Sequence, residues 1–241
     1  LEENGGGNNW WTTFPDHTEA DIDDIVQAYH GIDTYIKMDV LPYDGIHHID
    51  MHMKLLDEST LLMAEYPTGV ADGPQIEANL QYVLSNFTTK WGTPFDVVRI
   101  PSPPEYGGGY PNQNGDYLTY SNATFVNNTI LLPTYYEQYD TTAIRIWEEA
   151  MPGYNVVGID CDSGNDNIIA LSGAIHCITH TVAVEDPLMI SHLPLDDTED
   201  TDNAYVVNAE LSHRSGIANA TLSWATNPEG PWTDVAMTET I

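Results

Sequence analysis

Three segments of the chain show helical periodicity. Apolar side chains recur three or four positions apart, as one buried helix face requires, over residues 19–30, 75–87 and 140–151. Thr18 offers an N-cap to the first of these helices, and Gly31 follows its last turn. The pattern therefore predicts three helices. They begin roughly 55 to 65 residues apart, a spacing typical of an internal repeat.

Short runs of β-branched and aromatic residues lie between the helices and predict strands. The order strand, helix, strand recurs through the first 190 residues, which indicates an α/β architecture. The predicted strands cover Thr60–Tyr66, Phe95–Ile100, Ala123–Val126, Thr129–Leu132, Asn155–Ile159 and Ala174–Val182.

Alternating polar and apolar residues after Gly45 predict a further extended strand. In a strand, alternate side chains share a face, so we expect His48, Asp50 and His52 to point the same way. Because the opposite set is apolar and marks a core face, the polar set lines either solvent or a site. The apolar set consists of Ile49, Met51, Met53 and Leu55.

The composition changes after Ile190. Residues 191–203 include a run of acidic residues with no apolar side chain, which cannot fold by itself and indicates a linker. Residues 204–241 alternate like strands around two turns, but they are too few to form a stable β-sandwich. We therefore divide the chain into an α/β domain over 1–190, an acidic linker over 191–203 and the beginning of a β-rich domain over 204–241.

The charge of the chain is strongly unbalanced. Six Lys and Arg residues stand against 37 Asp and Glu residues, a formal net charge of −31. Such a surface repels nucleic acid and anionic membranes and attracts cationic ligands. Most of this charge is interpreted as adaptation to salty surroundings, and no apolar run is long enough to span a membrane.

Cys177 is the candidate nucleophile. A cysteine, a histidine and a carboxylate are the groups that thiol-based catalysis needs, and His48 and Asp50 supply the other two. A lone cysteine in an apolar segment is more often a small buried hydrophobic residue. In so acidic a chain, the thiolate of Cys177 needs a neighbouring cation, which a protonated His48 or a cationic substrate would supply.

A metal site is the alternative interpretation of the histidine-rich segment. His48, Asp50 and His52 could serve as three ligands at strand spacing, whereas His47 faces away from them. A hydrogen-bonded surface pair would explain His48 and Asp50 equally simply. Neither alternative involves the distant Cys177.

Several motifs, in consistent order over residues 1–190, resemble the family of Porphyromonas-type peptidylarginine deiminases and agmatine deiminases, which are guanidine-modifying penteins. The central match is Gly45-Ile46-His47-His48-Ile49-Asp50 followed by Lys54-Leu55-Leu56-Asp57. The other matching segments are Gly6-Gly7-Asn8, Arg99-Ile100-Pro101, Tyr117–Asn122, Leu131-Leu132-Pro133, Pro152–Asp160 and Ser172–Thr179.

The resemblance implies a fold. Members of this family are α/β propellers built from ββαβ modules in pseudo-five-fold symmetry, with the site in the central channel. The segment from Ser191 onward is similar to the part that leads into an immunoglobulin-like domain in secreted members. We therefore expect an incomplete pentein propeller followed by the start of an immunoglobulin-like domain, in a secreted or cell-surface protein.

The resemblance also implies a reaction and the residues that perform it. Cys177 would attack the guanidinium carbon of an arginine-like substrate, and Asp50 would hold guanidinium nitrogens in a bidentate grip. His48 would protonate the departing ammonia and then activate water to hydrolyse the thiouronium intermediate. Asn122 falls on a position that the family uses near the substrate. No metal or other cofactor is implied.

One element of the family pattern has no match. The family carries another guanidinium-binding Asp in a Trp-Arg-Asp-like motif before its Gly-Gly-Asn turn, and here Trp10-Trp11-Thr12-Thr13 follows that turn without an acid. Arg99 and Lys54 have the wrong charge to replace it. We therefore expect residues 1–241 alone to show little or no ammonia release.

Three functions remain open. The leading one is conversion of peptidyl-arginine to peptidyl-citrulline, favoured by the appended β-rich segment and by Ser172-Gly173-Ala174, which is less glycine-rich than in agmatine deiminases. The second is agmatine deimination in putrescine biosynthesis. The third is a non-catalytic pentein that only binds its ligand, in which Cys177 would be unreactive. The sequence leaves the oligomeric state open.

Overall fold

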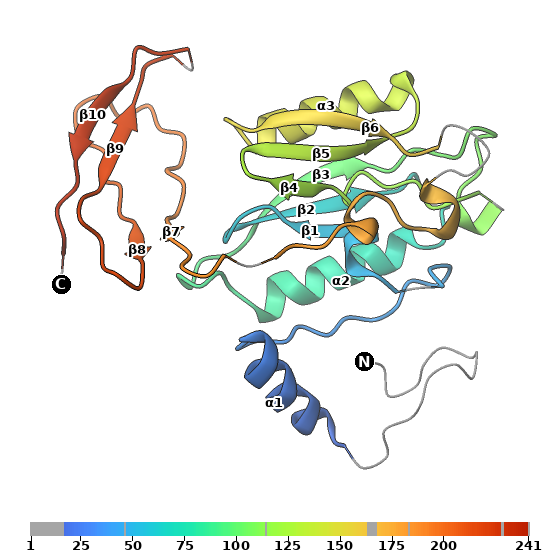
Figure 1. Cartoon of the computed structure of the whole chain (residues 1–241). Helices are drawn as coiled ribbons and strands as arrows, with labels where there is room; N and C mark the ends of the chain where they lie inside the picture. Colours follow the sequence, from blue (N-terminus) through green and yellow to red (C-terminus); the bar gives the residue numbers. More distant parts are fainter. Residues whose placement is uncertain are drawn as a thin grey trace. The chain divides into compact units, whose positions relative to one another are not determined.

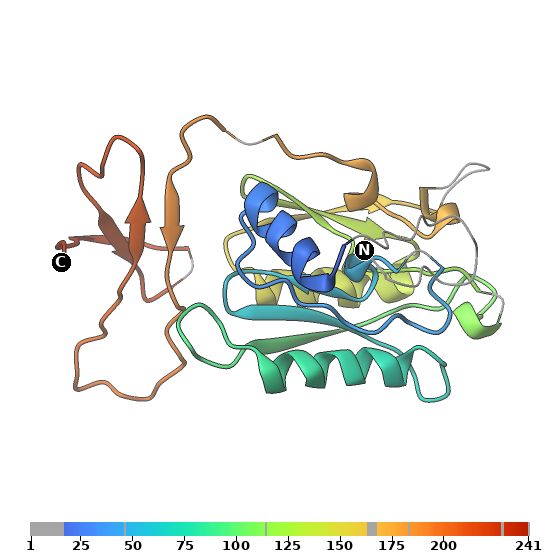
Figure 2. The same cartoon turned by 90° about the horizontal axis from the view of Figure 1, so that it is seen from below.

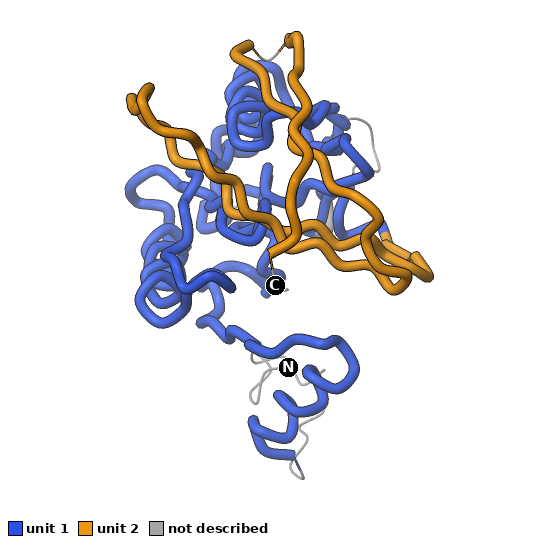
Figure 3. The backbone as a smooth tube through the Cα atoms, turned by 90° about the vertical axis from the view of Figure 1, so that its left-hand side faces the viewer, with its two compact units in different colours: residues 1–179 blue, residues 180–241 orange. Residues whose placement is uncertain are grey.

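A computed structural model of the chain describes residues 17–45, 47–113, 115–162, 168–182, 184–227 and 229–240. The backbone divides into two compact units, residues 1–179 and 180–241 (Figure 3). The Gly6-Gly7-Asn8 turn and the tryptophans beside it lie outside the described residues. The predicted domains remain an interpretation of composition, since two compact units do not show where functional domains begin and end.

The first unit contains a three-stranded sheet in the order β1-β2-β3 (Figure 1). β1 (Met53–Leu55) pairs antiparallel with β2 (Thr60–Glu65), and β2 pairs parallel with β3 (Asp96–Pro101). Helix α2 (Gly73–Asn86) forms the crossover between the two parallel strands, as parallel pairing requires. The module is thus ββαβ.

A second sheet repeats this arrangement with the order β4-β5-β6. β4 (Thr124–Val126) is antiparallel to β5 (Thr129–Thr134), β5 is parallel to β6 (Asn155–Asp160), and α3 (Glu137–Ala150) connects the parallel strands. The predicted α/β architecture and its internal repeat are therefore confirmed. The five-fold propeller that the resemblance implies stays a prediction.

Local sequence signals place the first helix, α1 (Glu19–His30), at its predicted bounds. The amide of Asp21 donates to Thr18 Oγ1 over 3.2 Å and the amide of Thr18 donates to Asp21 Oδ2 over 2.6 Å, a reciprocal capping box. Gly31 ends the helix in the left-handed conformation, with φ +67°. In the part of the chain that the structure describes, no helix is long and apolar enough to cross a membrane.

The larger core cluster joins the second module to the segments that later form the site. Trp147 of α3 is fully buried, and its indole N–H donates to the carbonyl of Tyr120 over 3.0 Å. Tyr120 itself donates to Asp140 at the start of the same helix. These bonds hold residues 119–122 against α3, so the segment that leads into β4 is held in one position.

The predicted strand over residues 48–55 is wrong in its first half. Ile49–Met51 forms a turn of 3₁₀ helix, in which the amides of Met51 and His52 donate to the carbonyls of His48 and Ile49 over 3.1 Å. Extended pairing begins only at Met53, where β1 starts. Because the turn breaks the alternation, His48 and Asp50 do not share a face with His52.

His52 belongs to the interior. It is 6% exposed, and neither ring nitrogen has a hydrogen-bond partner among the described residues. Burial lowers the pKa of His52 from 6.5 to about 4, against the opposing effect of the charges of Asp44 and Asp50. The ring is therefore neutral at pH 7 and packs as a core side chain.

The predicted strand Ala174–Val182 is also wrong. This segment contains a 3₁₀ turn, η4 (His176–Ile178), and no strand. The amides of Ala174 and His176 donate to the side-chain oxygen of Asn122 over 3.2 and 3.0 Å. A side chain 52 and 54 residues earlier thus accepts the hydrogen bonds that a strand would give to a neighbouring strand.

The second unit contains two antiparallel pairs of short strands. β7 (Met189–Ser191) pairs with β8 (Glu210–Ser212), and β9 (Thr221–Trp224) pairs with β10 (Thr233–Ala236). No helix or strand lies in the acidic stretch 192–209 between β7 and β8. The immunoglobulin-like topology remains a prediction, because these pairs alone do not define a sandwich. Figure 2 shows the elements of both units from below.

Leu62 and Leu55 provide a matched test of the core. Leu62 of β2 is completely buried, whereas Leu55 of β1 is 52% exposed. We expect Leu62→Ala to lower the free energy of unfolding by about 2–5 kcal/mol and Leu55→Ala to change it by less than about 1 kcal/mol. Urea denaturation followed by circular dichroism measures both. Equal losses in the two variants would contradict the described burial.

Replacement of His52 should reduce the acid sensitivity of the fold. The unfolded chain binds a proton at His52 below pH 6.5, whereas the folded chain binds it only near pH 4. Stability is therefore lost as the pH falls between these values, by an amount on the order of 3 kcal/mol. We expect His52→Leu to remove this part of the loss. The measurement is the free energy of unfolding at pH 7 and pH 4 for both proteins, and equal acid sensitivity would contradict the prediction.

Candidate functional site

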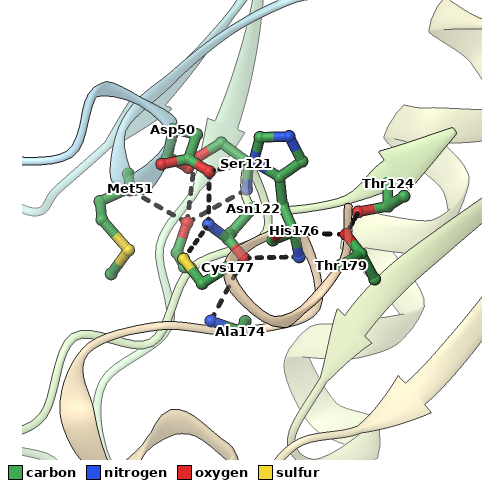
Figure 4. A network of polar contacts seen from close by, with 10 residues as sticks. Asp50, Met51, Ser121, Asn122, Thr124, Ala174, His176, Cys177 and Thr179 are labelled. Carbon is green, nitrogen blue, oxygen red and sulfur yellow. Dashed lines mark hydrogen bonds and ion pairs between the residues drawn. The ribbon is translucent and has the colours of Figure 1, made fainter. Parts of the chain in front are cut away.

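Three segments that are distant in sequence meet at one place (Figure 4). Asp50 lies in the 3₁₀ turn before β1, Asn122 lies just before β4, and Cys177 lies in η4. Since β1 and β4 run antiparallel to their neighbours, the residues before them lie at the carboxyl ends of β2 and β5. This is the edge at which α/β sheets place their ligand sites.

The side-chain amide of Asn122 connects these segments. Asn122 is completely buried, and its Nδ2 donates to Asp50 Oδ2 over 2.7 Å and to Cys177 Sγ over 3.1 Å. Its Oδ1 accepts the amides of Ala174 and His176. An amide side chain has two N–H donors and two acceptor lone pairs, so every hydrogen bond that Asn122 is able to make is made.

His176 contacts the carboxylate of Asp50 directly. The distance between His176 Nδ1 and Asp50 Oδ2 is 2.5 Å, while the side chain of His176 is half exposed and that of Asp50 is 14% exposed. The contact pairs a carboxylate oxygen, which accepts hydrogen bonds when it is ionised, with a ring nitrogen that is able to donate one. His176 was not among the residues selected from the sequence, in which its position next to Cys177 is the only signal for a role in the site.

Two buried hydroxyl groups hold the turn that carries Asp50. Ser121 Oγ donates to the backbone carbonyl of Asp50 over 2.9 Å, and Thr119 Oγ1 donates to that of Met51 over 3.0 Å. The two hydroxyls also contact each other at 2.9 Å. These bonds explain why the chain turns at residues 49–51 although its residue pattern is that of a strand.

Cys177 is exposed, and its sulfur lies against Gly173. A Cβ atom at residue 173 would lie 3.1 Å from Cys177 Cβ and 3.2 Å from Sγ, closer than ordinary contacts. The absence of a side chain at Gly173 therefore leaves room for the thiol. Cys161 contrasts with Cys177, because Cys161 is buried and burial raises the pKa of its thiol to about 11.

His48 completes the group. A ring nitrogen of His48, a carboxylate oxygen of Asp50 and the sulfur of Cys177 all lie within 4.8 Å of one another, with His48 and Cys177 exposed and Asp50 half-buried. The structure thus brings together the four residues selected from the sequence, Cys177, His48, Asp50 and Asn122. It does not show their roles.

The structure changes the composition of the predicted metal site. His52 lies in the core, and Cys177 takes its place beside His48 and Asp50. A soft sulfur, an imidazole nitrogen and a carboxylate form a donor set that also suits zinc. The site is therefore able to serve thiol chemistry or to hold a metal ion, and geometry alone does not separate the two.

Lys54 is a cationic residue near Asp50 and Cys177. From the sequence it was considered only as a replacement for the missing Asp, and rejected because of its charge. It is a half-buried residue of β1, and its ammonium lies 5.9 Å from the centre of the Phe125 ring. Burial lowers the pKa of Lys54, and the charges of Asp50 and Cys177 oppose this effect. The charges of Asp50 and Cys177 therefore help to keep Lys54 protonated.

Known proteins resemble this chain over about two thirds of its length. An agmatine deiminase from Medicago truncatula is 27% identical over 186 residues, which cover 68% of this chain and 48% of that protein. Among solved structures, an agmatine deiminase of Enterococcus faecalis matches with a TM-score of 0.54 at 15% identity, over 68% of this chain and 48% of that one. An agmatine deiminase of C. jejuni matches with a TM-score of 0.51 at 22% identity, over 66% and 46%.

These matches agree on the extent of the relationship. The structural matches show a shared α/β fold, and the chain spans about half the length of the curated relatives it matches. The sequence model of one family, described as Porphyromonas-type peptidyl-arginine deiminase, matches residues 13–182, which is more than half of the chain. The chain therefore belongs to the family of Porphyromonas-type peptidyl-arginine deiminases.

Proposed function

We propose that this site takes part in hydrolysis of a guanidinium group to a ureido group, with release of ammonia. The observation that supports the proposal best is the meeting of Cys177, His48 and Asp50 within 4.8 Å, at the carboxyl edge of the two sheets. Membership of a deiminase family and the names of the relatives support the same reaction class.

The charges and hydrogen-bonding groups of the site suit a guanidinium ion. A guanidinium group has only donors, and the carboxylate of Asp50 has only acceptors. Oδ2 of Asp50 already binds Asn122 and His176, while Oδ1 accepts no hydrogen bond from the described residues. Asp50 is therefore able to receive guanidinium N–H groups without losing the contacts that hold it. The formal charge of −31 attracts such a cation from solution.

The proposed reaction has two stages. The Cys177 thiolate attacks the guanidinium carbon, the bond from that carbon to one terminal nitrogen breaks, and His48 gives a proton to the leaving ammonia. The product of this stage is a thiouronium bound to the sulfur. His48 then takes a proton from water, the resulting hydroxide attacks the same carbon, and the carbon–sulfur bond breaks to return the thiolate. The added hydroxyl gives its proton to solvent, which releases the neutral ureido product.

Agmatine is the substrate that the comparisons favour over peptidyl-arginine. Agmatine deiminase is the activity that the names of the relatives give most often, although the matching family is described by its peptidyl-arginine deiminases. The concentrations of agmatine, free arginine and a capped arginine peptide that half-protect Cys177 against alkylation compare the two substrate classes without turnover. We expect agmatine to protect at the lowest concentration, and protection by the peptide at a lower concentration would reverse the choice.

The missing carboxylate limits what residues 1–241 do alone. The second guanidinium-binding Asp of the family has no match in this sequence, so little or no ammonia release from residues 1–241 alone remains our expectation. Tests of the site therefore include a measurement that does not require turnover. Alkylation of Cys177 is such a measurement, because a bound guanidinium covers the sulfur.

The two cysteines provide a matched test of the nucleophile. We expect iodoacetamide at pH 7.5 to label the exposed Cys177 and to spare the buried Cys161, whose pKa is raised to about 11. Millimolar agmatine should slow labelling of Cys177, as peptide mapping by mass spectrometry would show. Cys177→Ala should abolish any ammonia release, whereas Cys161→Ala should retain it. An unreactive Cys177 would instead favour the non-catalytic binding module.

Removal of the Asp50 charge should weaken guanidinium binding. In Asp50→Asn we expect the agmatine concentration that half-protects Cys177 to rise about tenfold or more, because a charge-assisted hydrogen bond is lost. Asp24→Asn, at an exposed position of α1, removes the same charge elsewhere and should leave protection unchanged. Equal weakening in both variants would show a general effect of charge and contradict the role of Asp50.

A further inference from the structure

A small pocket lies apart from the residues of the Asp50–Cys177 site, within the first unit. Its volume is about 230 Å³, which suits a small head group better than a drug-sized molecule. The walls come from two segments: the loop after β3 and the first turn of α3. The residues that line it are Pro104, Glu105, Tyr106, Gly108, Tyr136, Gln138 and Tyr139.

Three tyrosine rings line this pocket, and the ring of Tyr136 stands nearly perpendicular to each of the other two. The rings of Tyr106 and Tyr136 have centroids 6.4 Å apart at an interplanar angle of 77°, and those of Tyr136 and Tyr139 lie 5.5 Å apart at 72°. Perpendicular rings turn their faces in different directions, as the walls of a box do. The face of an aromatic ring carries negative electrostatic potential, which attracts a cation within about 6 Å of the ring centre.

The charges around the rings have one sign. Glu105 lines the pocket, and none of the lining residues is a lysine, arginine or histidine. Burial is the largest cause that raises the pKa of Tyr136, and the neighbouring Tyr139 is the next. The charges of Asp162 and Glu105 raise it further, so both carboxylates lie close enough to affect this ring. The box is therefore aromatic, acidic and without a resident cation.

The ring of Tyr136 is the part of this residue that is available for binding. Its hydroxyl oxygen is inaccessible to solvent and has no hydrogen-bond partner among the described residues. An oxygen that solvent does not reach is not open to a ligand either, so Tyr136 contributes its aromatic ring to the pocket.

We propose that the Tyr106–Tyr136–Tyr139 box is a second binding site, which takes the head group of an organic cation. The three ring faces hold the alkyl or planar surface of the cation, and Glu105 provides the counter-charge. The head group could belong to a free amine or to a basic side chain of a peptide, since both present the same chemistry. This site needs no residue of the proposed deiminase mechanism.

Ligand-observed NMR titration of the whole chain tests the proposal, with tetramethylammonium chloride as the probe and sodium chloride keeping the ionic strength constant. We expect saturable binding that weakens about two- to fivefold in Tyr106→Ala and in Glu105→Gln. Tyr106 is 91% exposed, so its removal leaves the core intact. tert-Butanol has nearly the same shape as the probe without its charge, and it should not compete.

Matched variants locate the binding. Tyr29→Ala removes a similarly exposed tyrosine from α1, and Glu58→Gln removes an exposed acid. Both variants should bind the probe like the wild type. Asp50→Asn should also bind the probe normally, because the box is independent of the catalytic site. Unchanged affinity in Tyr106→Ala and Glu105→Gln, or equal competition by tert-butanol, would overturn the proposal. Butylamine compared with capped lysine then distinguishes a free amine from a peptide side chain as the source.

Discussion

The arrangement of the site depends on one amide group, that of Asn122. Its two N–H groups bind the carboxylate of Asp50 and the sulfur of Cys177, and its oxygen binds two backbone amides of the segment that contains Cys177. Among the described residues, the other hydrogen bond between η4 and the turn before β1 is the one between His176 and Asp50. Because Asn122 is fully buried, the four bonds form away from competing water.

The rest of the fold supplies a rigid position for that amide. Trp147 binds the carbonyl of Tyr120, and the hydroxyls of Thr119 and Ser121 bind the turn that carries Asp50. The four residues 119–122 therefore pack against α3 while they bind the residues that precede β1. The second module thus carries the bridge, and the first module carries the acid that the bridge holds.

Sequence signals identified the elements whose causes are local. The helix Glu19–His30 was predicted at its observed bounds because its capping box and its final glycine lie within the helix ends themselves. Predicted strands failed where distant side chains decide the backbone. The turn at residues 49–51 depends on hydroxyls about 70 positions away, and the path of residues 174–176 depends on Asn122. No local pattern contains such information. Cys177, His48 and Asp50 were selected because their side chains are the groups that thiol chemistry needs, and the family resemblance added Asn122, whereas His176 and Lys54 were missed as members of the site.

The saturation of Asn122 has a consequence for which side chains this position accepts. Asp in its place would lack both donors and would set a second negative charge beside Asp50. Leu would leave the backbone amides of Ala174 and His176 without their acceptor and would remove one hydrogen bond from the carboxylate of Asp50. Gln would extend the amide by one methylene in a space that is already filled. If the side-chain amide of Asn122 were turned by 180°, its N–H groups would face the backbone N–H groups of Ala174 and His176. The four contacts therefore also decide which atom of the amide is oxygen and which is nitrogen. Position 122 therefore has no conservative replacement, although asparagine is an ordinary polar residue on most protein surfaces.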